Sequence, residues 1–203
     1  MPKVHIGAIS GLIVILSIIP YAIRTYQRKI NPNPTSWSLW AFIGLAILFT
    51  YKDSGAQDNL WPAIFSFTNP TLISVLTIAR REKWKPPDGF EIVCAVFGIA
   101  SIITWWNVRQ DPTMAAYALY LAIAADLAIA IPTIRDVWSN PKIDRPFAWF
   151  CFALGYLLAF FAVPEPSFAN YILPAYMSTA GLIIGYPLAM YRYKLGAPAM
   201  EWI

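Results

Sequence analysis

Seven long apolar stretches alternate with short polar segments along the chain. Most of them approach the roughly 20 residues, at about 1.5 Å rise each, that a helix needs to cross a bilayer. The polar segments carry helix-breaking prolines, such as Pro86-Pro87 and Pro164, which lack a backbone donor and end helices. This pattern predicts an all-α membrane protein with seven transmembrane helices. The predicted spans are residues 4–24, 37–51, 60–79, 90–108, 113–134, 147–163 and 169–191.

Composition agrees with this pattern. Of the 203 residues, 58% are hydrophobic and 13% are charged, whereas soluble domains average about 45 to 50% apolar and about 25% charged residues. The second span is short, so we expect it to tilt little, to sit behind its neighbours or to borrow interfacial residues such as Thr35 and Ser36. Cys94 and Cys151 both fall within spans, which favours small buried hydrophobic groups over a disulfide or a metal site. We expect no metal and no cofactor.

Basic residues predict the orientation, because short cytoplasmic loops retain arginine and lysine. Twelve basic residues fall at one end of a seven-span bundle and three, Lys3, Lys52 and Arg109, fall at the other. The N-terminus is therefore expected outside and the C-terminus in the cytoplasm, with the plasma or inner membrane as the location. The same topology rule explains the net charge of +4, so we expect no nucleic-acid partner. The twelve are Arg24, Arg28, Lys29, Arg80, Arg81, Lys83, Lys85, Arg135, Lys142, Arg145, Arg192 and Lys194.

The two halves of the chain are similar when they are offset by 112 residues without a gap. The matches predict one three-helix unit at 1–84, a linker helix at 85–110, a second unit at 111–195 and a tail at 196–203. Because three spans are an odd number, the linker helix lets both units face the same way, as in transporters built from parallel repeats. Matching pairs include Ile19 and Ile131, Pro20 and Pro132, Pro34 and Pro146, Trp37 and Trp149, Pro62 and Pro174, Ser66 and Ser178, and Arg80 and Arg192.

This 3-1-3 arrangement resembles the SWEET, MtN3 and PQ-loop superfamily of small-solute transporters. The resemblance rests on Ile19-Pro20-Tyr21 and Ile131-Pro132-Thr133, with Pro34 and Pro146 opening the second helix of each unit. It implies alternating access, with Pro20, Pro34, Pro132 and Pro146 as hinges and a solute held between the units. Tyr21 and Thr133 replace the glutamine of the PQ motif. Asn69 matches a family asparagine on the third helix, but Gly181 stands at its repeat position, so sugar specificity is not carried over.

Asp126 is the one acidic residue deep within a predicted span. A charge at that depth costs at least about 2.5 to 3.5 kcal/mol, so the carboxyl group is expected to face protein or water. Its repeat counterpart is Val14, which marks it as an addition to the shared scaffold. Two roles stay open: a protonated carboxyl group that holds two helices together, or a group that contacts the solute or relays a proton.

Helical spacing adds polar candidates to the solute-binding or proton-linked set. Thr133 shares a face with Asp126, and the corresponding face of the first helix carries Ser17 and Tyr21. Single serines in membrane helices are more often packing contacts than ligands, so Asn69, which precedes a proline, is the stronger candidate. Trp37, Trp40 and Trp149 are assigned to the membrane interface as anchors. The full set is Asp126, Asn69, Tyr21, Ser17, Thr133, Ser66 and Ser178.

The sequence therefore favours a transporter whose partners are a small polar solute and the lipid bilayer. Homo-oligomerisation stays open. An intramembrane enzyme would need a paired acid and base or a metal motif, and a retinal protein would need a lysine within a span; neither feature is present. A scaffold or receptor that does not transport stays open, because a fold does not determine function.

Overall fold

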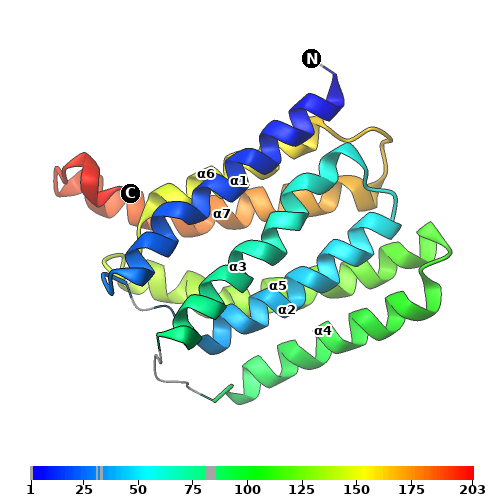
Figure 1. Ribbon diagram of the computed structural model, residues 1–203, viewed down its shortest axis with the longest axis horizontal. Helices are drawn as coiled ribbons and strands as arrows, with labels where there is room; N and C mark the ends of the chain where they lie inside the picture. Colours follow the sequence, from blue (N-terminus) through cyan, green and yellow to red (C-terminus); the bar gives the residue numbers. More distant parts are fainter. Residues whose placement is uncertain (1, 31, 33, 81–85) are drawn as a thin grey trace.

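The protein is all-helical. The computed structural model describes residues 2–30, 32, 34–80 and 86–203, which form seven α-helices and two short 3₁₀ turns (Figure 1). Arg81, Lys83 and Lys85 of the charge pattern, and Asn31 and Asn33 of a predicted junction, lie outside the described residues. The elements are α1 (Lys3–Tyr26), α2 (Pro34–Asp53), η1 (Asp58–Leu60), α3 (Trp61–Ala79), α4 (Gly89–Val108), α5 (Pro112–Ser139), α6 (Pro146–Phe161), α7 (Phe168–Lys194) and η2 (Ala199–Glu201).

The helices begin where the sequence supplies a cap or a proline. Asp88 and Glu91 form a reciprocal capping box at α4, and Asp111 accepts hydrogen bonds from the first amides of α5. Pro112 and Pro146 open α5 and α6, where the missing N–H has no intrahelical partner to lose. The second predicted span takes in Thr35 and Ser36 as expected, since α2 begins at Pro34. The fifth continues to Ser139, five residues beyond the predicted end at 134.

Six helices form the body of the bundle and α4 lies at its edge (Figure 1). α1 packs against α3 and α6, while α5 packs against α7 and α2. α2 also contacts α3, and α6 contacts α7. Among the described residues α4 packs mainly against α5 and, to a smaller extent, against α2. Its Ser101 hydroxyl donates to the Ala118 carbonyl of α5 at 2.8 Å, so this serine is a packing contact.

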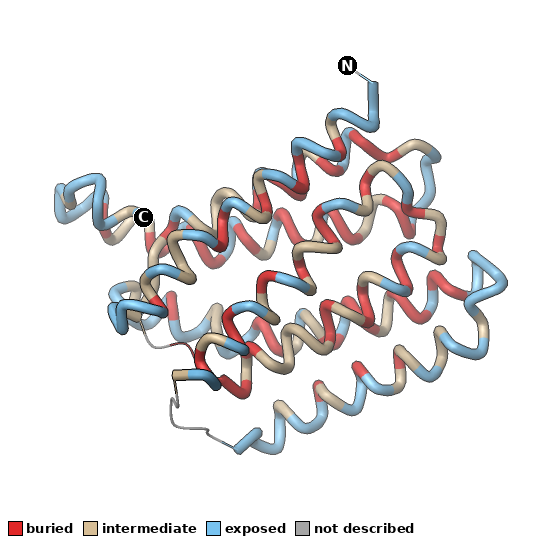
Figure 2. Tube along the Cα trace, viewed as in Figure 1, coloured by how far each residue is buried: buried red, intermediate tan, exposed pale blue. Residues whose placement is uncertain are grey.

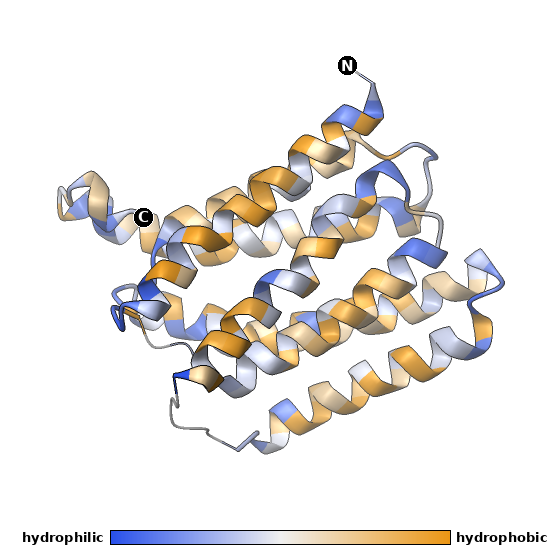
Figure 3. Cartoon of the chain, in the orientation of Figure 1, coloured by the Kyte–Doolittle hydropathy of each residue, from blue (hydrophilic) through white to orange (hydrophobic). Residues whose placement is uncertain are grey.

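The exposed surface of the bundle is strongly apolar. α4 is mostly exposed in Figure 2 and mostly hydrophobic in Figure 3, with side chains such as Val96 and Ile103 more than half exposed. Soluble monomers rarely expose contiguous apolar patches of more than a few hundred Å². Five segments are long and apolar enough to cross a membrane: α1, residues 58–79, α4, α5 and α7; α6 is apolar but shorter. The chain is therefore an all-α protein suited to a bilayer.

Most of the described basic residues gather at one end of the bundle, where α1, α3, α5 and α7 end; we call it the basic end. Arg192 on α7 is the buried member of this group, with a side chain that is only 1% exposed. Its guanidinium donates to the carbonyls of Glu201 (2.7 Å), Asp144 (2.6 Å), Leu188 (3.0 Å) and Pro141 (3.2 Å). These bonds tie the α5–α6 loop and the C-terminal turn to α7. Among the described residues Arg80, 112 residues earlier, makes one such bond, to the carbonyl of Thr25 at 3.2 Å.

Replacing Arg192 is expected to destabilise the protein much more than replacing Arg80. Arg192→Leu leaves several buried carbonyls without a donor, at an expected cost of about 3 kcal/mol. For a domain of this size that lowers the melting temperature by roughly 6 to 12 °C. Arg80→Leu, the matched control, should lower it by no more than about 4 °C. Thermal unfolding of both purified variants in detergent measures the difference, and equal losses would contradict the role given to Arg192.

Candidate functional site

A cavity of about 110 Å³ lies in the middle of the bundle. All six body helices contribute to it, and α4 does not. For comparison, an engineered apolar cavity of about 150 Å³ in another protein admits benzene, so this central cavity has the size of a small solute. Its lining is Ser17, Ile18, Tyr21, Trp37, Trp40, Gly44, Phe65, Ser66, Asn69, Pro70, Asp126, Ala148, Trp149, Phe152, Met177, Ala180, Gly181 and Ile184.

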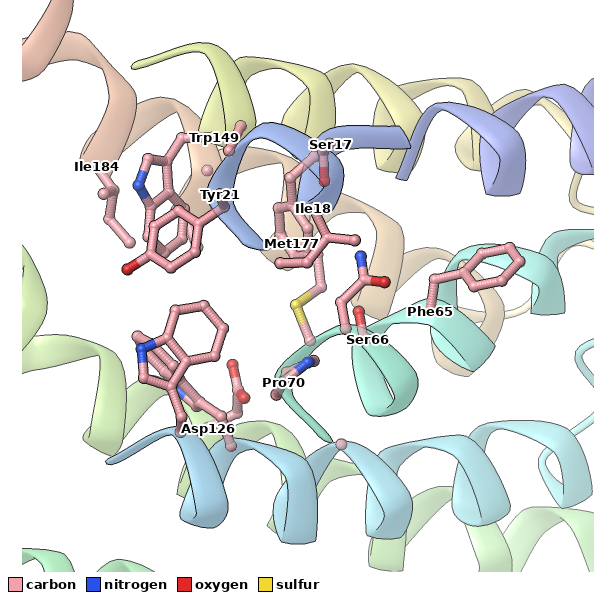
Figure 4. A pocket seen from close by; sticks show the side chains of 18 residues that line it. Ser17, Ile18, Tyr21, Phe65, Ser66, Pro70, Asp126, Trp149, Met177 and Ile184 are labelled. Carbon is pink, nitrogen blue, oxygen red and sulfur yellow. The ribbon is translucent and has the colours of Figure 1, made fainter. Parts of the chain in front are cut away.

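Asp126 is the charged member of this lining. The Tyr176 hydroxyl of α7 donates to its Oδ2 atom at 2.7 Å. Among the described residues Oδ1 has no hydrogen-bond partner, and no described arginine or lysine lines the cavity. In Figure 4 the carboxyl group projects toward the space beneath Tyr21 and Met177. The carboxyl group is thus held by one hydrogen bond and remains available to the interior of the cavity.

The other polar groups of the cavity are mostly occupied within the protein. The Ser17 hydroxyl donates to the Val14 carbonyl at 2.6 Å, and the Asn69 amide donates to the same carbonyl at 3.0 Å. The Ser66 hydroxyl makes a hydrogen bond with the Tyr156 hydroxyl. The cavity therefore offers one free carboxylate oxygen and few other hydrogen-bonding groups.

Close helix contacts shape two walls of the cavity. Pro70 frees the carbonyl of Ser66 from its intrahelical bond, and Gly44 of α2 lies against that carbonyl: a Cβ at position 44 would lie 2.5 Å from the Ser66 oxygen. At another wall Gly181 of α7 lies against α6, where a Cβ would lie 3.0 Å from the Trp149 carbonyl oxygen. A side chain at either position would force the helices apart or fill the cavity.

An aromatic layer separates the central cavity from a second cavity of about 260 Å³ at the basic end. Four side chains line both cavities: Tyr21, Trp37, Trp40 and Trp149. They form a continuous chain of ring contacts, with centroid distances of 5.1, 5.3 and 6.4 Å in that order. Figure 4 shows Tyr21 and Trp149 together at one side of the central cavity. We call these four residues the aromatic layer.

The second cavity, which we call the vestibule, carries three acidic residues: Glu91, Asp136 and Asp144. No described arginine or lysine lines it, although such residues are frequent at this end of the bundle. Glu91 accepts from the Ser36 hydroxyl at 3.0 Å. Pro132 and Thr133 of α5 also line the vestibule.

Buried hydrogen bonds close the bundle toward the other end. The Tyr51 hydroxyl donates to the Asn170 carbonyl at 2.8 Å and accepts from the Asn59 amide. These residues come from α2, α7 and η1, and all three are at most 2% exposed. These bonds therefore tie α2, α7 and η1 together at this end, and none of the three residues lines the central cavity.

The proline-freed carbonyls fall into two groups. Pro174 frees the carbonyl of Asn170, which accepts the Tyr51 bond, and Pro187 frees that of Ile183, which accepts from the Trp138 indole at 3.1 Å. The carbonyls freed by Pro20 and Pro132 are those of Leu16 and Ala128. Within the described part of the chain neither accepts a side-chain hydrogen bond. The α7 prolines are thus held by cross-helix bonds, while those of α1 and α5 are not.

The structure brings together most of the predicted site residues. Asp126, Asn69, Ser66, Ser17 and Tyr21 line the central cavity, and Thr133 lines the vestibule with Tyr21. Ser178 is buried and lines neither cavity. Among the predicted hinges, Pro132 lines the vestibule, Pro20 lies within α1, and Pro34 and Pro146 are buried at the starts of α2 and α6.

Three tryptophans that were expected to serve as anchors line the cavities instead. Trp37, Trp40 and Trp149 were assigned to the membrane interface, but they line both cavities, and Trp37 is 9% exposed. Depth along the helix suggested anchoring, whereas the side of the helix on which a ring projects depends on packing. Tyr176, the partner of Asp126, was also missed. Its position 50 residues from Asp126 in the sequence gave no signal that could have paired them.

Asp144 lies in the loop between α5 and α6, outside the helices. Its side chain accepts from the Trp149 indole at 2.9 Å and from the Arg145 amide at 2.7 Å. Burial raises the pKa of Asp144 to about 6, against the smaller lowering effects of these bonds and of the nearby arginines. The loop therefore contains a carboxyl group that gains a proton under mildly acidic conditions.

This raised pKa predicts a pH-dependent stability. Because folding raises the pKa, Asp144 stabilises the folded state at low pH, and this contribution is lost as the pH rises through about 6. Asp144→Asn mimics the neutral acid, so its melting temperature should exceed that of the unmodified protein by roughly 3 to 6 °C at pH 7.5. At pH 4 the two should match. Thermal scans in detergent across this range test it, and a difference that does not vary with pH would contradict it.

Comparisons with known proteins leave the family open: no family model, no curated protein and no solved structure matches the chain.

Proposed function

We propose that the protein is a membrane transporter that moves a small polar solute by alternating access between two three-helix repeats. The observation that carries this proposal is the central cavity, which all six body helices line, which contains an available carboxyl group and which shares its aromatic layer with the vestibule. A solute site at the interface of two repeats suits a mechanism in which the repeats move relative to each other and open the site to each side in turn. The repeat units are residues 1–84 and 111–195, joined by a linker helix at 85–110 and followed by a tail at 196–203.

The packing of the helices supports the repeat. Exchanging α1, α2 and α3 for α5, α6 and α7 maps the main contacts onto one another: α1·α3 onto α5·α7, α2·α3 onto α6·α7, and α1·α6 onto α5·α2. α4 has no counterpart in this exchange and lies at the edge. Arg80 and Arg192 each reach carbonyls that follow or end the first helix of their own unit. Seven spans in a 3-1-3 arrangement account for these correspondences.

The aromatic layer supports a gating role. It takes residues from both proposed units: Tyr21, Trp37 and Trp40 from the first and Trp149 from the second. A relative movement of the units would separate Trp40 from Trp149, whose ring centroids lie 6.4 Å apart, and would join the central cavity to the vestibule. By the distribution of basic residues we place the vestibule on the cytoplasmic side of a plasma or inner membrane, with the N-terminus outside.

The resemblance to the SWEET, MtN3 and PQ-loop superfamily remains part of this proposal. Its four hinge prolines correspond here to Pro20, Pro34, Pro132 and Pro146, and the carbonyls that Pro20 and Pro132 free have no side-chain donor among the described residues. A scaffold or receptor with the same fold is the second candidate. It would account for the bundle but gives no reason for a solute-sized cavity with an available carboxyl group.

Flux assays test the transporter proposal. Purified protein in liposomes should take up at least one member of a panel of labelled sugars, amino acids, nucleosides, carboxylates and organic cations. Asp126→Asn keeps the shape of the side chain and removes its charge, so uptake should fall at least tenfold, as about 1.4 kcal/mol of lost binding predicts. Asp58→Asn, in η1 and outside both cavities, should transport normally. No uptake of any panel member would contradict the proposal.

The difference between the prolines of α1 and α5 and those of α7 gives a second prediction. Pro132→Ala supplies an N–H for the Ala128 carbonyl and should stiffen α5, which should lower uptake several-fold and leave solute affinity within about twofold. Pro187→Ala is the matched control, because the carbonyl it would reach already accepts from Trp138. Uptake rates and binding isotherms for the solute found in the panel measure both. Equal effects of the two substitutions on uptake would remove Pro132 as a hinge.

A further inference from the structure

We infer that the central cavity binds a small organic cation of the ammonium class, with a quaternary ammonium group as its best fit. This inference deepens the proposed function, on which its transport step rests. It depends on three features of the described residues: the aromatic walls, the single carboxyl group and the acidic vestibule.

Aromatic rings make up much of the wall of the cavity. Tyr21, Trp37, Trp40 and Trp149 form its side toward the vestibule, and Phe65 and Phe152 extend the wall beyond them. The rings are mostly tilted or edge-to-face, with Trp37 and Trp40 at 83° and Trp149 and Phe152 at 71°. An arrangement of rings at steep angles surrounds a guest on several sides. Such aromatic cages attract quaternary ammonium groups through the negative faces of the rings, most strongly for tryptophan.

Among the described residues that line the central cavity, the one ionisable acidic or basic side chain is that of Asp126. Asp126 lies on the lining with its Oδ1 atom free of hydrogen bonds, and no described basic residue lines the cavity. A carboxylate in an apolar setting is costly unless a cation accompanies it. A bound ammonium group would supply the missing counter-charge. An anionic solute would instead face Asp126 without a compensating arginine or lysine.

A polyhydroxylated solute fits this cavity less well. A sugar needs a partner for each hydroxyl group that it brings out of water. The Ser17, Ser66 and Asn69 donors are already bonded to protein atoms, and the remaining lining is largely hydrophobic. A quaternary ammonium group has no hydrogen-bond donors, so it makes no such demand.

The acidic residues of the vestibule also favour a cationic solute. Its three carboxyl groups belong to Glu91, Asp136 and Asp144, and it has no described basic residue in its lining. Arg192 binds the backbone carbonyl of Asp144 rather than its carboxylate. Carboxylates that line a hollow raise the local concentration of cations. The basic end of the protein therefore contains an acidic recess directly beyond the aromatic layer.

Choline and its neutral carbon isostere, 3,3-dimethylbutan-1-ol, provide a matched pair of probes. They have nearly the same shape and differ in the positive charge. Isothermal titration of the full-length protein in detergent should give choline at least tenfold tighter binding than the isostere, and tetramethylammonium should compete with choline. Equal binding of the two, or no binding of choline at millimolar concentration, would overturn the inference.

Substitutions locate the effect within the cavity. Asp126→Asn should reduce choline affinity at least tenfold and leave the isostere unaffected, whereas a carboxyl group that only holds α5 to α7 would be replaced by asparagine with little loss. Trp40→Phe should retain most of the affinity and Trp40→Leu should lose severalfold more. Trp106→Leu, an exposed position on α4, controls for loss of a tryptophan elsewhere. A melting temperature close to that of the parent protein checks that each variant is folded.

Flux separates this inference from the proposed function. Choline binding without uptake of choline or any panel solute would leave the cation site standing and remove the transporter. Uptake of a neutral or anionic solute without choline binding would leave the transporter standing and remove the cation site. Uptake of labelled choline that tetramethylammonium inhibits and Asp126→Asn abolishes would support both.

Discussion

Polar groups in an apolar bundle need partners, and this requirement determines much of the structure. The buried Arg192 guanidinium has four carbonyl acceptors, and the carbonyls freed by two prolines of α7 accept from Tyr51 and Trp138. Apart from the Arg192–Leu188 bond, which lies within α7, these bonds connect different segments of the chain. Where the requirement is only partly met, at Asp126, a cavity adjoins the group. A carboxyl group with one hydrogen bond therefore marks the candidate site.

The asymmetry between the two halves concentrates at this site. Val14 and Asp126 stand at equivalent positions, as do Asn69 and Gly181. On one side the Asn69 amide binds the Val14 carbonyl, which joins α3 to α1. On the other side Gly181 brings α7 close to α6, and the bond between α5 and α7 comes from Tyr176 to Asp126. One half thus uses its polar side chain for internal packing, and the other presents a carboxyl group to the cavity.

The prolines show how a repeated sequence feature acquires different roles. Pro62 and Pro174 lie 112 residues apart in the sequence. Pro62 is at the start of α3, where it breaks no intrahelical bond, whereas Pro174 lies inside α7. Pro20 and Pro132 match in sequence and in position within their helices. The lack of a side-chain donor at their freed carbonyls, within the described residues, leaves α1 and α5 with fewer restraints against bending than α7.

The sequence by itself determined the helices, their approximate ends and the candidate carboxyl group, because apolar run length, prolines and the cost of a buried charge are local properties. Five of the polar residues that line the central cavity were predicted from depth within a span, the 112-residue repeat, helical spacing and the family resemblance. Only the tertiary structure decided that three tryptophans face cavities rather than the membrane interface, that Tyr176 holds Asp126, and that Ser178 stays outside the site. These outcomes depend on the rotation of each helix about its axis, which packing between distant segments determines and no single segment encodes.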